Sequence, residues 1–464
     1  MSILRIVEML ERAHKGPVCP VKEWNIKVIP TNVAKKLKEY GLNGTYDAEN
    51  PINTDDELAD RFFKAGFELA VETGVLCQDT ERVINVTADE LRSAIKDAPS
   101  QLFVGKGVDE VLLKSRRPED PYPAKGSAPT AVVVDEQLFT KYVEAMVQSR
   151  EIDLLEGPTL TTVYGRKALS RTPFESLVGW YEAMLSKEAL NRAGRSGMCK
   201  IGILSSPTEY GHLTGFGTAG GLDPEKDLSL VLSPGELTNS YEVYHKVIQS
   251  NACGGRVIIN YGTMIGGYPG PIEGTVLCYI ANALLTFAVN PVIHAAGVEV
   301  TDLRYLGGCG REGVWVHSAA LQALSRNSHH LIWSMMSQVG GPGTDHLLYE
   351  DAVIYLMYSV SGGSGSFTTR STGVKYPEYL TPLECKFSCE MLHKSAGMTR
   401  EKANEIVKVL IPKYENNLRT PPKGKSFREL YNLDTLKPNK EYLDLYLKIK
   451  KELIDLGVPL DSNY

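Results

Sequence analysis

The middle of the chain alternates short apolar runs with helical patterns, and this alternation constrains the fold more than any other feature. Units of strand, loop and helix that recur about every 30 residues are typical of a parallel sheet. At least five such units in series favour a closed (β/α)8 TIM barrel over a doubly wound sheet, and no GxGxxG motif follows a strand. From about Asp153 onward, strands are predicted at 198–204, 228–232, 256–262 and 291–300, and helices at 174–193, after Pro234 and at 275–289.

Helical segments flank this alternating region on both sides. Residues 56–74 have an amphipathic helical pattern, and Thr87 with Glu90 forms a capping box that starts another helix. The last 70 or so residues also have helical patterns. We therefore divide the chain into three parts: 1–150 is an N-terminal extension with the start of the barrel, 151–390 is the main barrel body, and 391–464 forms C-terminal helices packed on the barrel.

The charge balance and the apolar runs exclude several classes of protein. Lys and Arg total 50 against 56 Asp and Glu, for a net charge of −6, so nothing suggests a nucleic-acid partner. Charges interrupt the apolar residues of the N-terminus, which lacks the core of a signal peptide. The apolar run 275–289 is shorter than the roughly 20 residues that span a bilayer. We expect a soluble, cytoplasmic protein without a membrane partner.

The eight cysteines are dispersed and form no CxxC pair, which indicates reduced thiols. Cys385, Cys389 and His393 would share one face of a helix. They could hold a metal, but a buried helix face is the better interpretation. We therefore expect no tightly bound metal in this chain.

Several motifs in consistent order resemble those of the monomethylamine methyltransferase family. The resemblance covers nearly the whole chain, and because the short pieces are collinear it is specific. The matching segments are FFKAGFELAVETGVLCQDTERVI (62–84), VGKG (104–107), AGRSGM (193–198), IGGYPGPIE (265–273), GPGTDHLLYE (341–350), GKSFRELY (424–431) and DLGV (455–458).

This resemblance implies an activity and partners. Family members pass a methyl group from methylamine to Co(I) of a corrinoid (cobalamin) carried by a separate corrinoid-binding protein, which docks over a cleft at the top of the barrel. Members are homo-oligomers, with hexamers known. A pyrrolysine residue holds the amine, and two glutamates, a glutamine and a tyrosine surround it.

The residues at these signature positions differ in this chain. An ungapped match around AGRSGM places Ile201 at the pyrrolysine position, with Lys200 beside it. The two glutamate positions fall on Leu230 and Asn260, and the glutamine and tyrosine positions fall near Met335 and Ser337. We expect Ile201 to lie at the bottom or wall of the cleft, and the joint replacement predicts a donor other than monomethylamine.

A quaternary ammonium donor fits an apolar cleft floor, because it leaves as a neutral amine and has no N–H group to satisfy. Such a cation is bound by aromatic faces. Tyr261, Tyr210 and Tyr164 each follow or end a predicted strand, where barrel active sites form, so we expect them to bind the substrate. For each one, a role as a core or interface tyrosine is the alternative.

Polar residues near predicted strand ends supply further candidates. His212, Glu209 and His294 are candidate catalytic groups, since a neutral donor would need a general acid. Arg311 and Asp345 match polar positions of the family and are candidate substrate ligands. The alternatives are a satisfied core histidine for His294 and a structural Arg311–Glu312 ion pair.

These observations favour a corrinoid-dependent methyltransferase that works without pyrrolysine on a small methylated, quaternary amine. Two alternatives remain open at this stage. One is a TIM-barrel hydrolase or lyase that has lost corrinoid coupling. The other is a non-catalytic protein that binds methylated amines.

Overall fold

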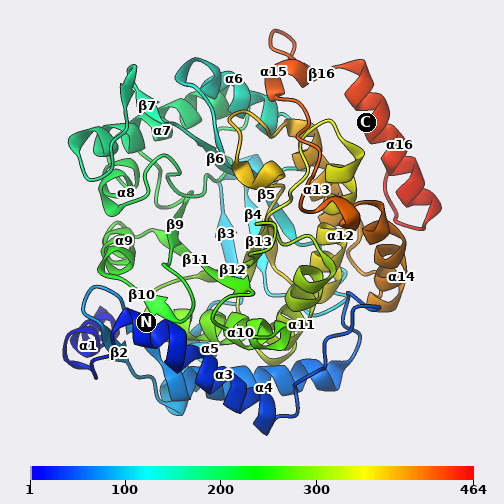
Figure 1. The fold of residues 1–464 in the computed structure, drawn as a ribbon. Coiled ribbons are helices and arrows are strands. Elements are labelled where there is room, and N and C mark those ends of the chain that lie inside the picture. The colour runs from blue at the N-terminus through cyan, green and yellow to red at the C-terminus, as the bar shows by residue number, and fades with distance from the viewer. Residues whose placement is uncertain (1–2, 464) are drawn as a thin grey trace.

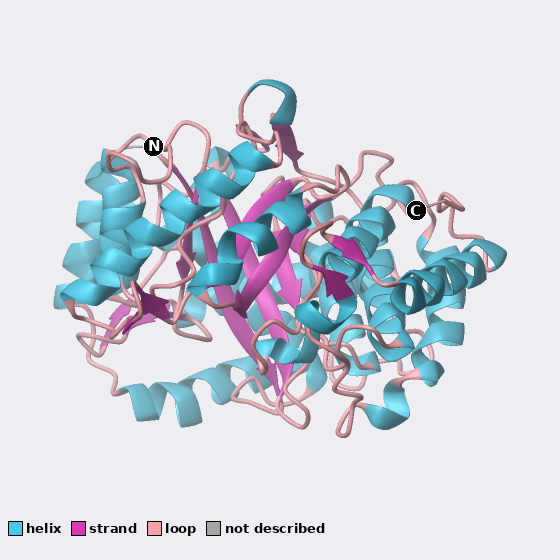
Figure 2. Ribbon diagram, turned by 90° about the horizontal axis from the view of Figure 1, so that it is seen from above, coloured by secondary structure: helices cyan, strands magenta, loops and turns pink. Residues whose placement is uncertain are grey.

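The computed structural model describes residues 3–463, and its centre is a curled sheet of seven parallel strands (Figures 1 and 2). The strand order is β6-β5-β14-β13-β12-β11-β9. The strands of this sheet are β5 (Lys125–Val133), β6 (Leu154–Thr159), β9 (Leu228–Leu232), β11 (Arg256–Ile265), β12 (Ala295–Asp302), β13 (Trp333–Met336) and β14 (Gly365–Phe367).

A short segment at 199–202 bridges the two edge strands of the curled sheet. The Ile201 N–H donates to the carbonyl of Leu155 in β6 at 2.7 Å, and the Leu228 N–H of β9 donates to the carbonyl of Lys200 at 2.9 Å. The sequence predicted a longer strand here. The chain leaves the strand direction because Gly202 has φ +66°, where a Cβ would come 2.6 Å from Leu230 Cβ.

The two faces of the sheet bury different layers, because side chains alternate along each strand. In β11, Ile258 belongs to the apolar cluster on the inner face, whereas Ile259 packs in the outer cluster with the helices. The β3–β4 hairpin (Gln101–Val104 and Val111–Lys114) joins the inner cluster through Leu102 and Leu113. Its loop bonds to residues just before the strands, so the hairpin closes the amino-terminal end of the sheet. The opposite, carboxyl-terminal end is left for a site.

Helices cover the outer face of the sheet (Figure 1). Within residues 3–463, one helix, α10 (Ile272–Val289), has the length and composition to cross a membrane, and 89% of it is buried. The helix predicted at 275–289 is therefore present, and it is buried in the core. The other helices of this layer are α6 (Glu136–Val147), α7 (Pro173–Arg192), α8 (Glu209–Gly215), α9 (Tyr241–Ala252), α11 (Arg311–Asn327), α12 (Asp345–Ser361) and α13 (Pro382–Lys394).

The terminal helices pack against this layer, and the helix predicted over 56–74 is present as α4 (Asp56–Thr73). The predicted capping box is present, since Thr87 and Glu90 bond reciprocally at the start of α5. These helices are α1 (Ile3–Lys15), α2 (Val21–Glu23), α3 (Ile29–Glu39), α4 (Asp56–Thr73), α5 (Ala88–Asp97), α14 (Arg400–Leu410), α15 (Phe427–Leu430) and α16 (Lys440–Asp455). The remaining strands form small sheets: β1 (Val75–Cys77), β2 (Arg82–Ile84), β10 (Thr238–Asn239), β7 (Thr162–Val163), β8 (Arg166–Lys167), β15 (Tyr431–Asn432) and β16 (Lys437–Pro438).

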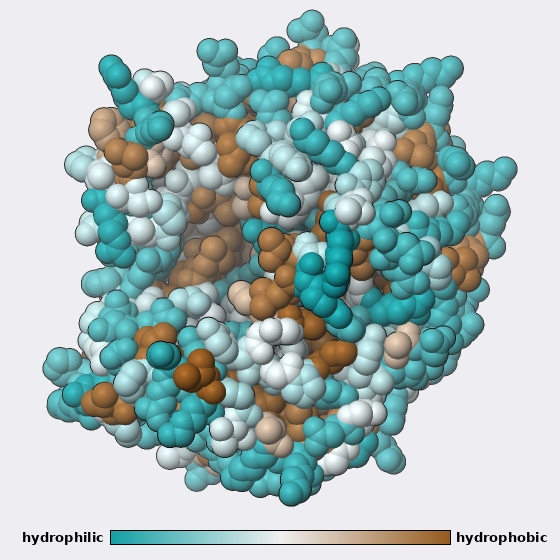
Figure 3. Space-filling model, in the orientation of Figure 1, coloured by the Kyte–Doolittle hydropathy of each residue, from teal (hydrophilic) through white to brown (hydrophobic). Residues whose placement is uncertain are grey.

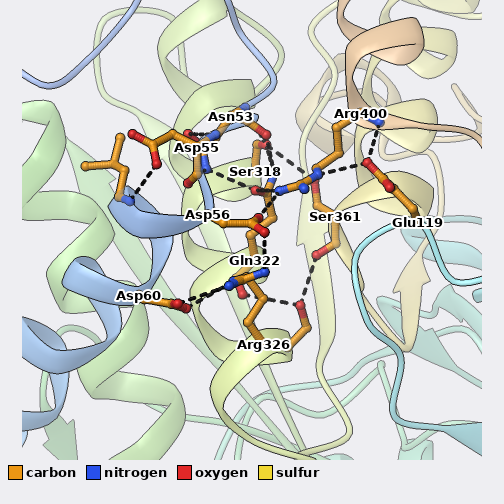
Figure 4. Close-up of polar contacts among 12 residues, drawn as sticks. Asn53, Asp55, Asp56, Asp60, Glu119, Ser318, Gln322, Arg326, Ser361 and Arg400 are labelled. Carbon is orange, nitrogen blue, oxygen red and sulfur yellow. Dashed lines mark hydrogen bonds and ion pairs between the residues drawn. The ribbon is translucent and has the colours of Figure 1, made fainter.

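A polar network fastens both terminal segments to the outer layer (Figure 4). The Arg400 guanidinium at the start of α14 donates to Asp56 of α4 at 2.7 Å, to Gln322 of α11 at 2.9 Å and to Glu119 at 3.0 Å. Arg326 of α11 also pairs with Asp56, at 2.6 Å. One guanidinium therefore links the N-terminal extension, the layer around the sheet and the C-terminal helices.

Candidate functional site

A cleft of about 180 Å³ opens at the carboxyl ends of the strands. Figure 3 shows a hollow in this face of the molecule with apolar residues on its floor. In parallel α/β folds, this end of the sheet is where ligands bind. The cleft is lined by Thr130, Ala131, Glu156, Leu204, Leu230, Leu232, Ser233, Asn260, Tyr261, Gly262, Glu299, Met335, Phe367 and Arg370.

Glu156 is the most unusual of these residues. It lies near the end of β6, two residues after the inward-facing Leu154, and only 3% of it is exposed. Burial raises the pKa of its carboxyl group to about 8, because an ionised carboxylate loses its hydration there. Its Oε2 atom has no hydrogen-bond partner among residues 3–463. Glu156 is therefore a carboxyl group held in the cleft without a structural partner for one oxygen.

An ion pair occupies another wall of the cleft. Arg370 Nη1 donates to Glu299 Oε1 at 2.7 Å, and the Ser337 hydroxyl donates to the same carboxylate oxygen at 2.8 Å. The Arg370 backbone N–H donates to Gln338 Oε1 at 2.7 Å, and Gln338 is in turn held by Asp351 at 2.8 Å. Arg370 is therefore held through both its backbone N–H and its guanidinium group. The buried Nε atom of that group nevertheless has no acceptor within the described chain.

Asn260 and apolar side chains form the rest of the inner wall. Asn260 lies two residues after the inward-facing Ile258, and its buried Oδ1 accepts no hydrogen bond from any described residue. A Cβ at Gly297 on the neighbouring strand would come 2.6 Å from that oxygen, so the glycine is what leaves room for the amide. Leu230, Met335 and Phe367 supply the apolar surface.

The cleft therefore contains three buried polar atoms that no described residue satisfies: Glu156 Oε2, Asn260 Oδ1 and Arg370 Nε. A buried polar group without a partner costs about 1–3 kcal/mol. Three such groups around one cavity indicate a ligand that brings its own hydrogen-bonding groups. Asn260 Oδ1 accepts a hydrogen bond, Arg370 Nε donates one, and the Glu156 carboxyl accepts on both oxygens when it is ionised.

Comparison with known proteins identifies the family. The family model described as monomethylamine methyltransferase MtmB matches residues 4–458. The chain belongs to the monomethylamine methyltransferase family. It is 27% identical to monomethylamine methyltransferase MtmB2 of Methanosarcina acetivorans and 28% identical to MtmB3 of Methanosarcina barkeri, in each case over 97% of both chains. Its fold matches the crystal structure of the Methanosarcina barkeri monomethylamine methyltransferase with a TM-score of 0.93 and 26% identity, over 98% of both chains.

The residue expected at the family's pyrrolysine position faces inward. Ile201 is fully buried in the inner cluster, together with the cleft-lining residues Met335 and Phe367, and it does not itself line the cleft. Its neighbour Lys200 points the opposite way, toward Glu182 of α7, at 2.8 Å. Leu230 and Asn260, expected at the glutamate positions, both line the cleft.

The three tyrosines expected to bind a cation do not present their rings to the cleft. Tyr261 contributes to its lining, but the side chain belongs to the outer cluster, where burial raises the pKa of the hydroxyl and hydrogen bonding with Thr286 of α10 opposes that shift. Tyr164 and Tyr210 are 62% and 42% exposed and stand outside the cleft lining. The predicted aromatic cage is wrong for these residues, because Tyr261 follows the inward Asn260 and must point outward.

The candidate catalytic residues lie elsewhere as well. His212 is buried between α8 and the outer face of β9, where its Nε2 lies 3.1 Å from the Ser250 hydroxyl and 3.2 Å from that of Ser229. Burial lowers its pKa to about 3, so it is neutral at physiological pH. His294 precedes β12, at the amino end of the sheet, where the Val257 N–H donates to its Nδ1 at 3.2 Å. Glu209 begins α8 and is not part of the lining. The structure brings none of the three to the cleft.

Arg311 and Asp345 also serve other positions. Arg311 begins α11 and pairs with Glu415 of the C-terminal segment at 2.7 Å, whereas Glu312 pairs with Arg304. The alternative of an Arg311–Glu312 pair is therefore wrong too. Asp345 is exposed at the start of α12, where its carboxylate accepts from the His346 N–H at 2.8 Å. Arg311 and Asp345 therefore both lie at the start of a helix, and neither lines the cleft.

Sequence reasoning missed Glu156, Glu299 and Arg370. Glu156 ends an apolar run just before Gly157, so the rule that sites form at strand ends could have found it. Glu299 follows Ala295 by four residues on the same inward face of β12. Arg370 gave no such signal, because it lies beyond a three-residue strand and meets Glu299 only in the fold.

The cysteine face considered for a metal is part of the packed core. Cys385 and Cys389 are fully buried, and His393 Nε2 lies 2.8 Å from Asp153 Oδ2. Among residues 3–463, one group of side chains has the spacing to hold a metal ion, namely Glu39, Glu68 and Glu72. The ammonium of Lys36 already lies within 2.8 Å of all three of these carboxylates.

Proposed function

We propose that this chain transfers a methyl group from a methylated ammonium donor to Co(I) of a corrinoid carried by a separate protein, without pyrrolysine. Family membership over nearly the whole chain supports the reaction class. The observation that carries the proposal is the buried, partly unpartnered Glu156 carboxyl in a cleft at the carboxyl ends of the strands. Family membership does not favour a hydrolase, a lyase or a passive binding protein.

The chemistry defines what the cleft must do. The corrinoid of the partner would supply Co(I), a strong nucleophile that takes the methyl group. The donor's carbon–nitrogen bond breaks with its electron pair remaining on nitrogen, so the nitrogen must carry four substituents to leave as a neutral amine. Glu156 and Asn260 would accept hydrogen bonds from the ammonium and keep it protonated. Leu230 and Met335 exclude water around the methyl group.

The same geometry revises the expected donor. A quaternary ammonium has no N–H to offer Asn260, and the predicted tyrosine rings do not surround the cleft. A donor with at least one N–H matches the unpartnered acceptors better. We keep the prediction that monomethylamine is not the substrate, because Leu230 and Asn260 stand where glutamates are expected.

The corrinoid must approach from outside, because a cavity of about 180 Å³ cannot enclose a corrinoid ring. Exposed apolar side chains follow the carboxyl ends of several strands, on the same face as the cleft mouth. Such a rim suits a docking protein. It includes Leu169, Tyr210, Leu213, Leu232, Met264, Tyr268, Leu303 and Leu306.

Four expectations about the whole protein enter this proposal. We propose that the seven strands and the segment 199–202 form a (β/α)8 barrel, flanked by an N-terminal extension and C-terminal helices with the boundaries expected from sequence. We propose a cytoplasmic homo-oligomer, as in the family, with a hexamer as one possible state. A monomer in light scattering at micromolar concentration would contradict that assembly.

The reaction is tested with purified chain, chemically reduced cobalamin and a set of N-methylated amines. Disappearance of the Co(I) absorption that depends on both the chain and the amine supports the proposal. A rate equal to the enzyme-free background for every donor, also with a corrinoid protein present, would overturn it.

A further inference from the structure

The size of the cleft bears on the identity of the donor. The cleft leaves about 180 Å³ open to the centres of water molecules, which is room for several of them. A simple methylammonium ion has two heavy atoms and would leave most of that space to water. The cavity therefore has room for a donor that carries something beyond its methylated nitrogen.

Arg370 indicates what that additional part is. Its Nη1 is occupied by Glu299 at 2.7 Å and by Ser337 at 3.2 Å, so the guanidinium cannot turn away without breaking an ion pair. Its Nε–H is buried and donates to no residue between 3 and 463. A guanidinium N–H held in this way binds a carboxylate well, because both the hydrogen bond and the charge favour it.

Two other residues of the lining offer the complementary groups. Glu156 Oε2 and Asn260 Oδ1 are unpartnered acceptors on residues that are each more than nine-tenths buried. They suit an ammonium that retains an N–H. One small cavity is thus lined by groups that suit a cation and by a group that suits an anion.

We propose, resting on the function above, that the methyl donor is a zwitterionic N-methylated amino acid. Its ammonium binds Glu156 and Asn260, and its carboxylate binds the Nε–H of Arg370. A zwitterion adds no net charge next to the Glu299–Arg370 pair. In the reaction the methyl–nitrogen bond breaks, the electron pair stays on nitrogen, and the product is the same amino acid with one methyl group fewer. The carboxylate is unchanged.

The expected selectivity follows from the unpaired guanidinium. A donor without a carboxylate leaves Arg370 Nε buried and unsatisfied. A hydrogen bond to a charged group contributes enough free energy that its loss weakens binding by about 10- to 100-fold. Glycine itself retains both charged ends but leaves the apolar surface of Leu230 and Met335 unfilled.

Calorimetric titration of the full chain at pH 8 tests this with matched ligand pairs. N-methylglycine is compared with dimethylammonium, and N,N-dimethylglycine with trimethylammonium, since each pair differs only by the carboxylate. We expect each amino acid to bind at least about tenfold more tightly than its partner. Equal affinities within a pair, or no binding of either amino acid, would overturn the proposal.

Two arginine variants test whether Arg370 is the residue that binds the carboxylate. Arg370→Gln should abolish the preference for the carboxylate, whereas Arg311→Gln should preserve it. Arg311 is a matched control because both side chains are 24% exposed and pair with a glutamate at 2.7 Å. If Arg370→Gln keeps the preference, the assignment is wrong. Thermal unfolding shows whether each variant is folded. If a variant does not fold, the comparison of ligand pairs on the wild-type protein still tests the proposal.

Failure of this inference and failure of the proposed function give different results. Binding needs no corrinoid, so selective binding of N-methylglycine without methyl transfer to Co(I) supports the assignment of the cleft to this class of ligand and contradicts the methyltransferase function. Methyl transfer from dimethylammonium with no advantage for N-methylglycine supports the function and overturns the donor class.

Discussion

Replacing Lys200 with methionine should destabilise the folded protein by about 3–5 kcal/mol. Lys200 and Glu182 are 1% and 0% exposed, and the ammonium donates to Glu182 Oε1 at 2.8 Å, to the Glu156 carbonyl at 2.7 Å and to the Gly202 carbonyl at 2.8 Å. Each hydrogen bond to a charged group contributes about 1.5–3 kcal/mol, but methionine avoids the cost of burying the ammonium. The net loss of free energy therefore comes mainly from the Glu182 carboxylate, which would stay buried without a compensating charge.

The same substitution should loosen the cleft. Glu182 accepts hydrogen bonds from the N–H groups of Leu204 and Ser205, at 2.9 and 2.6 Å, and Leu204 lines the cleft as Glu156 does. The ion pair therefore positions two cleft residues from behind. We expect weaker donor binding in Lys200→Met even at temperatures where the variant is fully folded.

Urea unfolding of wild type and variants at one protein concentration measures the free energy of unfolding. Adding Glu182→Gln to Lys200→Met should recover part of the loss, with a coupling above about 1 kcal/mol in the double-mutant cycle. Lys27→Met, which removes an exposed pair with Glu23, should leave the midpoint unchanged. A loss below 1 kcal/mol for Lys200→Met, or additive single effects, would refute this reasoning.

Three further predictions follow from the cleft and its surroundings. Because burial raises the pKa of Glu156 to about 8, above its value in the unfolded chain, the native state retains a proton that the unfolded state loses, and stability should fall as pH rises from about 4.5 to 8. In urea unfolding, the free energy of unfolding should fall less over that pH range for Glu156→Gln than for wild type. Equal declines for the two proteins would contradict the prediction. His212→Gln should lower the free energy of unfolding by about 1–3 kcal/mol, because hydrogen bonds are lost, and should keep the rate of methyl transfer to free cobalamin. Loss of methyl transfer in folded His212→Gln protein would instead indicate that His212 is a catalytic group. Leu232→Asp on the rim should weaken docking of a corrinoid protein and so raise the KM for that protein, whereas Val409→Asp on α14 should leave this KM unchanged. Equal KM values for the two variants would contradict the docking face.

Much of the fold could be predicted because the strands are apolar runs bounded by polar residues. The run at 228–232 lies between Asp227 and Ser233, and it forms β9 with those bounds. The predicted strand at 198–204 ends at Gly202, and just beyond it the Glu182 carboxylate, rather than a neighbouring strand, binds the N–H groups of Leu204 and Ser205. That tertiary contact has no local sequence signal.

The site residues were harder to predict because they depend on which way each side chain points. Asn260 and Tyr261 are adjacent in one strand, so both could not face the cleft. His294 precedes its strand, and the rule that sites form at carboxyl ends already argued against it. The Glu299–Arg370 pair joins residues 71 positions apart, which only the closed sheet brings together.

The most direct test compares methyl transfer to Co(I) cobalamin by wild type, Glu156→Gln and Glu209→Gln. Glu209 is a matched control, since its Oε2 is also buried without a partner within residues 3–463, but it lies outside the cleft lining. We predict that wild type and Glu209→Gln consume the Co(I) absorption with an N-methylated donor, and that Glu156→Gln is slower by about 100-fold, since a charge-assisted contact to the donor is lost. No donor-dependent transfer by wild type, or full activity of Glu156→Gln with loss in Glu209→Gln, would contradict the account.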